Sequence, residues 1–378
     1  MKNIVVWGFP TRIVFGAGAV SETGTALSGS KHALIVTDAG VNGAGLVAPV
    51  VGALEKAGIA HTIFDGVKGN PNEAHVDAGL TAYREAQADC VVALGGGSPM
   101  DAAKVIAMRV NNHRPLADYD DANGGDRHVT GAVPPIIAVP TTAGTGSEVG
   151  RAGVVTVAST GRKTVIFHPS LLPRTAILDP ALTRSMPAHV TAATGYDALT
   201  HCLEALVAAT DHPMCDGIAL EGIKLVRGAL ARAVSHGDDL DARGDMMKAA
   251  MMGAVAFQKG LGACHSLAHP LGSQCDLHHG LANAICLPEV VRFNLEAAEG
   301  RYAEVAGILG GTADPARCAG DLEALRKEVG LAASLKEAGI EEIPLEALAD
   351  EAIEDGCHRA NPRSCTREDL RGLYQRVS

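Results

Sequence analysis

A short apolar run that ends in three consecutive glycines is the feature that most constrains the fold of this chain. Residues 91–94 are Val-Val-Ala-Leu, residues 95–97 are all glycine, and a helical pattern follows over residues 99–110. A strand that passes through a glycine turn into a helix is the repeating unit of parallel α/β sheets. The sequence therefore predicts such a sheet around residue 95.

The same alternation of strand and helix extends over most of the first half. Strand patterns at residues 33–37 and 136–139 flank helical patterns at residues 45–57 and 72–88, and residues 11–15 indicate an edge strand. Alternation of this kind predicts an α/β N-terminal domain with a parallel, Rossmann-like, dinucleotide-binding sheet.

Strand patterns become rare after Pro187, and alanine-rich helical patterns continue to the end of the chain. We therefore expect an all-α C-terminal domain, and we place the two domains at residues 1–186 and 187–378.

The glycine turn has the composition of an anion-binding loop. Gly95, Gly96 and Gly97 would let a phosphate approach backbone amides at the start of a helix, where the helix dipole favours negative charge. Ser98 suits the N-cap of that helix, and Asp101 could close a capping-box bond to the Ser98 amide. The spacing differs from that of the common nucleotide-binding motifs, so an ordinary tight turn explains this loop equally well when it is taken alone.

Two further segments support a dinucleotide site. The loop at residues 140–148 contains Thr141, Thr142 and Thr145 among glycines, as expected of a loop around a phosphate or ribose, although alone it could be a flexible connector. Asp38 ends the strand at residues 33–37. Its carboxylate could accept hydrogen bonds from a ribose and repel a 2'-phosphate, which favours NAD over NADP, or it could simply cap a turn.

Metal-ligand chemistry is indicated by two polar pairs in apolar surroundings. Asp197 and His201 are four residues apart in a predicted buried helix, and His265 and His269 have the same spacing. Residues four apart lie on one helix face, so their heads can converge on one point. Each pair alone could be an ordinary helical contact, but together they form a plausible set for Fe²⁺ or Zn²⁺.

The remaining histidines refine this set. Pro270 should place His269 at a kink or helix end, so His265 and His269 need not share one task. Of the pair at residues 278–279, we favour His279 as a ligand because Gly280 permits close backbone approach.

Composition narrows the function classes. The net charge of −11 argues against nucleic acid or an anionic membrane as a partner. Nine cysteines, an odd number without a C-x-x-C pair, indicate a reduced, cytoplasmic protein.

Six ordered motifs carry a family resemblance: GGGSPMDAAK, PTTAGTGSE, DPALT, ATGYDALTH, HSLAHPLG and HHGLANA. This set resembles the iron-dependent (group III) alcohol dehydrogenase family over nearly the whole chain. The resemblance implies a metal-dependent, NAD(P)-linked alcohol dehydrogenase or aldehyde reductase that acts in a cleft between two domains. We expect it to form a homodimer or a higher homo-oligomer.

The resemblance also implies individual roles, with iron preferred over zinc as the metal. The implied ligands are Asp197, His201, His265 and His279, and His269 is implied to be a catalytic histidine beside the nicotinamide. The implied coenzyme-binding residues are Asp38, Gly95, Gly96, Gly97, Ser98, Asp101, Thr141, Thr142 and Thr145.

The substrate is less constrained. The segment between Phe257 and His265 looks one residue shorter than is common in the family, which resembles a subgroup and would place Lys259 near the substrate end of the cleft. A strand after Glu148 would put Gly150 and Ala152 on one face, lining a roomy pocket, with Arg151 on the other. Lys259 and Arg151, with Lys163, could bind a carboxylate or phosphonate, or could simply be surface cations.

Two alternatives from other classes stay open. One is a dehydroquinate synthase-like or glycerol phosphate dehydrogenase-like enzyme on a similar scaffold. The other is a non-catalytic NAD-binding assembly protein. The motif set argues against the first, and the four filled ligand positions argue against the second.

Overall fold

The computed structural model describes residues 8, 9 and 11–378. These residues fall into two compact units. The sheet unit comprises residues 8–142 and 147–185, and the helical unit comprises residues 143–146 and 186–378. The main change of unit along the chain therefore falls between Ser185 and Met186.

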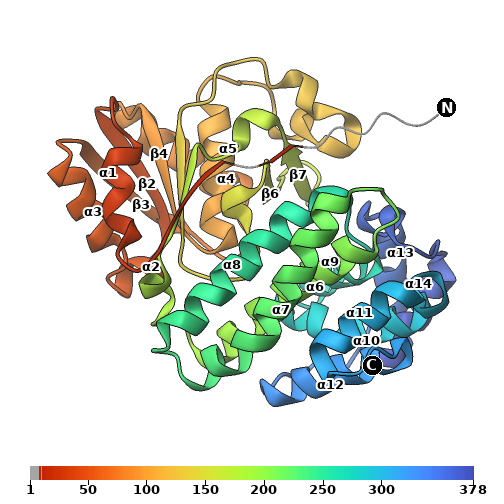
Figure 1. Cartoon of the computed structure of the whole chain (residues 1–378). Helices are drawn as coiled ribbons and strands as arrows, with labels where there is room; N and C mark the ends of the chain where they lie inside the picture. The colour runs from red at the N-terminus through yellow and green to blue at the C-terminus, as the bar shows by residue number, and fades with distance from the viewer. Residues whose placement is uncertain (1–7, 10) are drawn as a thin grey trace. The chain divides into compact units, whose positions relative to one another are not determined.

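Six parallel strands form the centre of the sheet unit, in the order β1-β8-β5-β4-β2-β3. Their bounds are β1 Arg12–Phe15, β2 His32–Asp38, β3 Ala60–Val67, β4 Cys90–Gly95, β5 Ile136–Pro140 and β8 Thr175–Leu178. The predicted parallel sheet is confirmed, and β1 lies at one edge of it among the described strands, as expected (Figure 1).

Helices cover both faces of this sheet because successive residues of each buried strand point to opposite sides. In β2, Leu34 and Val36 pack against α4 (Glu73–Glu85) and α5 (Gly97–Arg109), whereas Ala33 and Ile35 pack against α1 (Thr23–Ala26) and α3 (Val47–Lys56). The near-continuous apolar runs of the strands follow from this burial on both faces.

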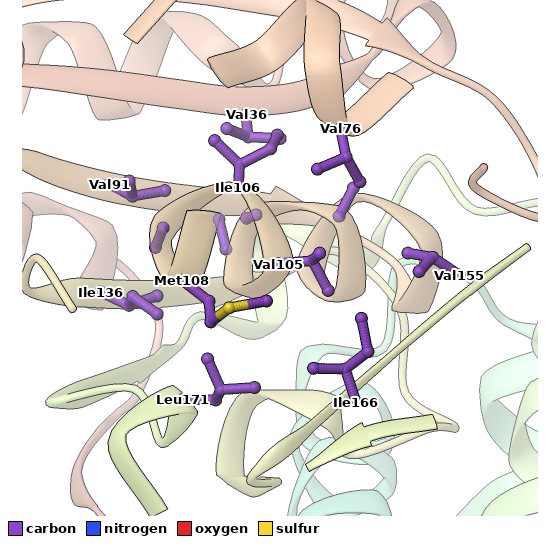
Figure 2. Close-up of a cluster of buried hydrophobic side chains, with 14 of the residues drawn as sticks. Val36, Val76, Val91, Val105, Ile106, Met108, Ile136, Val155, Ile166 and Leu171 are labelled. Carbon is purple, nitrogen blue, oxygen red and sulfur yellow. The ribbon is translucent and has the colours of Figure 1, made fainter. Parts of the chain in front are cut away.

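Helix α5 is itself enclosed between two β-structures. On one side it meets the sheet. On the other it meets an antiparallel hairpin of β6 (Ala152–Thr156) and β7 (Lys163–Phe167). In Figure 2, Ile106 lies beside Val36, whereas Val155 and Ile166 of the hairpin lie on the other side of the helix. This double burial fixes the helix that follows the glycine turn.

Two local expectations in this unit are wrong. Helix α5 begins at Gly97, its N-cap is Gly96, and no side chain caps it, so Ser98 is not the N-cap. Gly95 adopts a φ of 144°, which only glycine adopts readily, and this lets the chain turn into the helix earlier than the side chains suggest. Strand β6 begins at Ala152, so Gly150 and Arg151 precede it and do not follow strand alternation.

The helical unit contains no strand among the residues that the structure describes after β8. Its α-helices are α6 Ala188–Val207, α7 Pro213–Ser235, α8 Leu240–Ala256, α9 Ala263–Gln274, α10 His279–Asn294, α11 Glu299–Gly310, α12 Cys318–Glu328, α13 Leu345–Glu354 and α14 Arg367–Val377. Every residue of α6 from Thr191 onward is buried, and α7, α8 and α10 pack around it (Figure 1). A helix buried on all sides must satisfy its polar side chains internally.

Pro270 does not end its helix. Helix α9 continues to Gln274, so of the two places expected for His269 the helix end is wrong, and a kink at this point stays a prediction. Proline removes one backbone donor, and packing of α9 against α10 and α13 holds the remaining turns together. None of the helices in the described part of the chain has the length and hydropathy needed to cross a bilayer.

Candidate metal centre and coenzyme pocket

Three helices of the helical unit bring four donor side chains together. Asp197 and His201 lie on α6, His265 lies on α9, and His279 is the first residue of α10. The Oδ1 atom of Asp197 lies 3.9 Å from His201 Nε2, 3.8 Å from His265 Nε2 and 3.4 Å from His279 Nε2. Residues up to 82 positions apart in sequence thus converge on one carboxylate oxygen.

The spacing of these donors suits a metal ion. Ligands about 2.1 Å from a tetrahedral ion lie about 3.4 Å from one another. The donor atoms of Asp197, His265 and His279 all lie within 4.8 Å of one another, and the ring of His201 stacks on that of His265 with centroids 4.7 Å apart. One carboxylate with three imidazoles is a donor set that fits Fe²⁺ or Zn²⁺.

The protonation states also suit a metal. Burial lowers the pKa of His201 to about 4 and that of His279 well below its usual value. For Asp197, burial alone would raise the pKa, but the neighbouring histidines, His201 foremost, outweigh it and lower the pKa to about 2. Near neutral pH the carboxylate is therefore ionised and these two imidazoles carry free lone pairs, as metal ligands require.

Two residues around the donors have roles that the sequence did not reveal. Glu204, two helical turns after Asp197, accepts a hydrogen bond from His265 Nδ1 at 2.5 Å and another from the Cys264 amide at 2.7 Å. This fixes a proton on Nδ1 and turns Nε2 of His265 toward Asp197 Oδ1, the orientation that a metal ligand needs. Asn283, one turn after His279, donates to Asp197 Oδ1 at 2.8 Å.

Sequence signals for these two residues existed but were weak. Glu204 continues the polar face of α6, and Asn283 has the four-residue spacing to His279 that brings helical side chains together. Only the fold shows which buried group each of them serves.

His269 lies beside this cluster without joining it. Its ring stacks on that of His279, with centroids 5.3 Å apart and planes 14° apart. Its Nδ1 atom lies 2.8 Å from Oδ2 of Asp355, a carboxylate 86 residues later in the chain. The structure thus separates His269 from the proposed ligands, although it shares a helix with His265.

A cavity of about 480 Å³ opens in the sheet unit at the carboxyl ends of β2, β3, β4 and β5. The strand order reverses between β2 and β4, and such switch points bind nucleotides in doubly wound folds. Six of the predicted coenzyme residues line the cavity: Asp38, Gly96, Gly97, Ser98, Thr141 and Thr142.

Close packing explains the glycines here. A side chain at Gly95 would collide with the ring of Pro99, its Cβ lying 2.7 Å from Pro99 Cγ, and a Cβ at Gly96 would lie 3.3 Å from Thr142. Asp38 does cap a turn, because its Oδ1 accepts from the Val41 amide at 2.9 Å at the start of helix α2 (Ala39–Gly43). The capping interpretation of Asp38 is thus confirmed, and the same carboxylate borders the cavity.

Three predicted coenzyme residues, Gly95, Asp101 and Thr145, are not among those that line this cavity. Asp101 directs its carboxylate inward, accepting from Ser147 Oγ at 2.7 Å and from the Val154 amide at 3.2 Å. Thr145 belongs to the short segment of residues 143–146, which groups with the helical unit.

Lys259, the main residue of the anion site expected for the substrate, already has partners within the protein. Lys259 is buried, and its Nζ pairs with Asp216 Oδ1 at 2.5 Å and donates to the Leu206 carbonyl at 2.9 Å. An ammonium held in this way cannot bind a substrate carboxylate, so the substrate role expected for Lys259 is wrong. Arg151 lies over the ring of Phe167, 5.5 Å from its centroid.

Ala152 contributes through its backbone. Its carbonyl accepts from the buried Lys104 Nζ at 2.9 Å, which ties the start of β6 to α5. No contact in the described residues marks its side chain as a substrate contact.

Comparison with known proteins identifies the family. A family model of iron-containing alcohol dehydrogenases matches residues 10–180, and a model of the C-terminal part of the same family matches residues 191–378. The chain is 40% identical to 4-hydroxybutyrate dehydrogenase of Cupriavidus necator over 96% of each chain. It is 38% identical to NAD-dependent methanol dehydrogenase of Bacillus methanolicus, also over 96% of each chain. The structure superposes on that of a 1,3-propanediol oxidoreductase with a TM-score of 0.95, at 36% identity over all of both chains.

These matches span both units, and they disfavour the synthase-like, glycerol phosphate dehydrogenase-like and non-catalytic alternatives. The resemblance seen in the six motifs is confirmed. The chain belongs to the iron-containing alcohol dehydrogenase family, whose members are oxidoreductases that act on CH–OH groups with iron and NAD.

Proposed function

We propose that this chain interconverts a short primary alcohol and its aldehyde at a metal held by Asp197, His201, His265 and His279. The observation that carries the proposal is that Oδ1 of the ionised Asp197 lies 3.4–3.9 Å from an imidazole nitrogen of each of the three histidines. A divalent iron ion bound there would act as a Lewis acid toward the substrate oxygen.

The coenzyme would bind in the cavity at the switch point of the sheet. The backbone amides of residues 95–98 would hold the pyrophosphate, and Thr141 and Thr142 would contact the nicotinamide half, with Thr145 nearby. Asp38 would accept from the adenosine ribose and select NAD over NADP. Its second oxygen, Oδ2, has no capping bond among the described residues and suits this task.

Proton transfer is assigned to His269. During alcohol oxidation the hydroxyl proton would pass to His269 Nε2 while the carbon gives its hydride to NAD⁺, leaving the aldehyde and NADH. In reduction, the proton and hydride would return by the same route. The position of the ring beside His279, with 41% of its side chain exposed, supports this role.

The substrate class follows from the relatives taken together. Three of these relatives are named for 4-hydroxybutyrate, methanol and 1,3-propanediol, which are small molecules that each carry an unbranched primary alcohol carbon. We therefore propose short unbranched primary alcohols as substrates. A panel of 1-propanol, 1-butanol, 1,3-propanediol and 4-hydroxybutyrate, with 2-propanol as the secondary alcohol, tests this class, and a clear preference for 2-propanol would contradict it.

The metal assignment is tested by two adjacent histidines. His279→Ala should lose most bound metal and nearly all turnover, whereas His278→Ala, which alters an exposed neighbour, should keep both. Elemental analysis of both purified variants, with circular dichroism to confirm folding, decides the matter. Full metal occupancy in His279→Ala would refute the ligand set.

We also propose a cytoplasmic homo-oligomer, most simply a dimer. All nine cysteines are free thiols, as in reducing compartments, and the oligomer is what the family resemblance implies. Cell fractionation and light scattering after size-exclusion chromatography test these two proposals separately.

A further inference from the structure

The side chain of His269 is held by a chain of hydrogen bonds within the helical unit. Asp355 follows the last turn of α13, and α13 packs against α9 (Figure 1). Its Oδ2 lies 2.8 Å from His269 Nδ1. Its Oδ1 accepts from Ser266 Oγ at 2.7 Å and from the Cys357 amide at 2.8 Å. Both carboxylate oxygens are therefore occupied, and each has a distinct partner.

The direction of these bonds is determined by chemistry. Ser266 Oγ accepts from the His358 amide at 2.9 Å, so its own hydrogen points to Asp355. Because an ionised carboxylate can only accept, the proton between His269 and Asp355 belongs to His269 Nδ1. Burial alone would raise the pKa of Asp355, but its hydrogen bond with His269 and its other donors outweigh burial and lower that pKa, which keeps the carboxylate ionised.

The opposite nitrogen of the ring then becomes the basic one. A neutral imidazole with its proton on Nδ1 has its lone pair on Nε2. Within the described part of the chain, the hydrogen bond of the His269 side chain is made at Nδ1 and not at Nε2. The side chain is 41% exposed, and its ring lies beside those of His279 and His265. The free lone pair is thus available next to the candidate metal centre.

We propose that Asp355 is a positioning residue. It holds His269 in the Nδ1–H tautomer and so presents Nε2 as the atom that accepts or returns the substrate proton. The inference rests on the proton role assigned to His269 in the proposed function. Ser266 and the Cys357 amide act through Asp355 by fixing which of its oxygens faces the imidazole.

The geometry makes Asp355→Asn a sharp test. Because Ser266 and the Cys357 amide both donate to the Oδ1 position, the amide oxygen of asparagine would occupy that position and its NH₂ group would face His269. The NH₂ group can only donate, so Nδ1 would lose its proton and Nε2 would gain it. The substitution should therefore invert the tautomer with almost no change in shape.

The tautomer can be read by ¹⁵N NMR of protein labelled at histidine and loaded with Zn²⁺, with His269→Asn to assign the signal. The wild type should show a protonated Nδ1 at His269, and Asp355→Asn should show a protonated Nε2. A wild-type His269 that already carries its proton on Nε2, or an unchanged tautomer in the variant, would overturn the proposal.

Kinetics provide the second readout. Asp355→Asn should lower kcat on the order of 10²–10⁴-fold, the usual contribution of a proton-transfer group, with metal content and the KM for NAD unchanged. Glu351→Gln is the matched control, because Glu351 also lies on α13 and accepts hydrogen bonds from α9, at Ser273 and Gln274, away from His269. Its kcat should equal that of the wild type.

A double-mutant cycle separates positioning from general damage. In the His269→Asn background, Asp355→Asn should cause no further loss of kcat. An equal loss in both backgrounds would mean that Asp355 is merely structural. If Asp355→Asn does not fold, Ser266→Ala, which removes one donor from Oδ1, should lower kcat by about tenfold at unchanged metal content, and an unaltered kcat would count against the proposal.

The two hypotheses fail in different ways. Full activity of His269→Asn would refute the proton role of His269. If His269→Asn is inactive and Asp355→Asn is fully active, the proton role of His269 stands. Only the proposal that Asp355 positions His269 is then refuted.

Discussion

A charged side chain has the role that its partners give it, and Lys259 shows this most clearly. Its place between Phe257 and His265 suggested a substrate cation, yet its ammonium lies in a buried pair with Asp216, which Arg301 also contacts at 2.5 Å. A buried charge that is already paired has little free energy to gain from a substrate. We therefore expect Lys259 to stabilise the folded protein and not to bind the substrate.

Lys259→Met should lower the free energy of unfolding by about 2–4 kcal/mol, because it leaves Asp216 partly buried with one cation fewer. The ratio of kcat/KM for 4-hydroxybutyrate to that for 1-butanol should not change. Urea unfolding and the two substrate assays check this. Lys224→Met, in an exposed pair with Glu221, is the control and should cost less than about 1 kcal/mol. A large change in the ratio of the two kcat/KM values would contradict this expectation and would support a substrate role for Lys259.

Asp38 combines two tasks at one carboxylate, and two substitutions separate them. Asp38→Gly should remove both the cap on the Val41 amide and the negative charge, whereas Asp38→Asn keeps an acceptor for the cap and removes only the charge. Both should narrow the preference for NAD over NADP, and only the glycine variant should lose about 1 kcal/mol of stability. Kinetics with both coenzymes and thermal unfolding measure this. Equal use of both coenzymes by the wild type would leave Asp38 as a cap alone.

At the scale of elements, a buried polar cluster holds helix α5 in place, and the sequence motifs did not predict the hydrogen bonds of this cluster. Lys104 donates from Nζ to Ser147 Oγ and to the Ser147 carbonyl, both at 2.7 Å, and Asp101 accepts from the same serine hydroxyl. The neighbouring Glu148 is buried, and burial raises its pKa to about 7. Lys104 and Asp101 of the GGGSPMDAAK motif therefore bind Ser147 of the PTTAGTGSE motif, which holds the loop after β5 against helix α5.

Glu148 should make stability depend on pH. Between about pH 4.5 and pH 7 the folded protein keeps the Glu148 proton that the unfolded chain releases. The free energy of unfolding should therefore fall as pH rises through this window, on the order of 2–3 kcal/mol. Glu148→Gln should remove this fall, and Glu85→Gln, at an exposed site, should not. Urea unfolding at pH 4.5, 6 and 7.5 measures it, and parallel pH profiles for wild type and Glu148→Gln would contradict it.

At the scale of the whole molecule, the two candidate binding sites draw their residues from different units. The proposed metal ligands come from α6, α9 and α10 of the helical unit, and the cavity is lined by residues of the sheet unit. We propose that the units are separate domains that respond to different ligands.

Scanning calorimetry should then resolve two transitions. Zn²⁺ at about 100 times its Kd should raise the transition of the helical unit by about 5–10 °C, and NAD at a similar excess should raise that of the sheet unit. His279→Ala should abolish only the Zn²⁺ shift. A single transition that both ligands move equally would contradict the assignment of one domain to each unit.

The sequence alone determined the features that depend on neighbours in the chain. Alternating strand and helix patterns specified the parallel sheet, the glycines at residues 95–97 specified the turn, and the spacing of Asp197 and His201 specified a shared helix face, because each of these is set by local backbone geometry. The family motifs then assigned roles by position. The proposed ligand set could therefore be named from the sequence.

Only the tertiary structure decided which distant polar groups meet. Glu204 and His265 are 61 residues apart, His269 and Asp355 are 86 apart, and Lys259 lies 43 residues from its partner Asp216. A buried polar group must find a partner, but local periodicity does not specify which one, since the choice depends on how helices pack. For this reason the sequence misassigned Lys259, and the carboxylate that orients His269 became visible only in the fold.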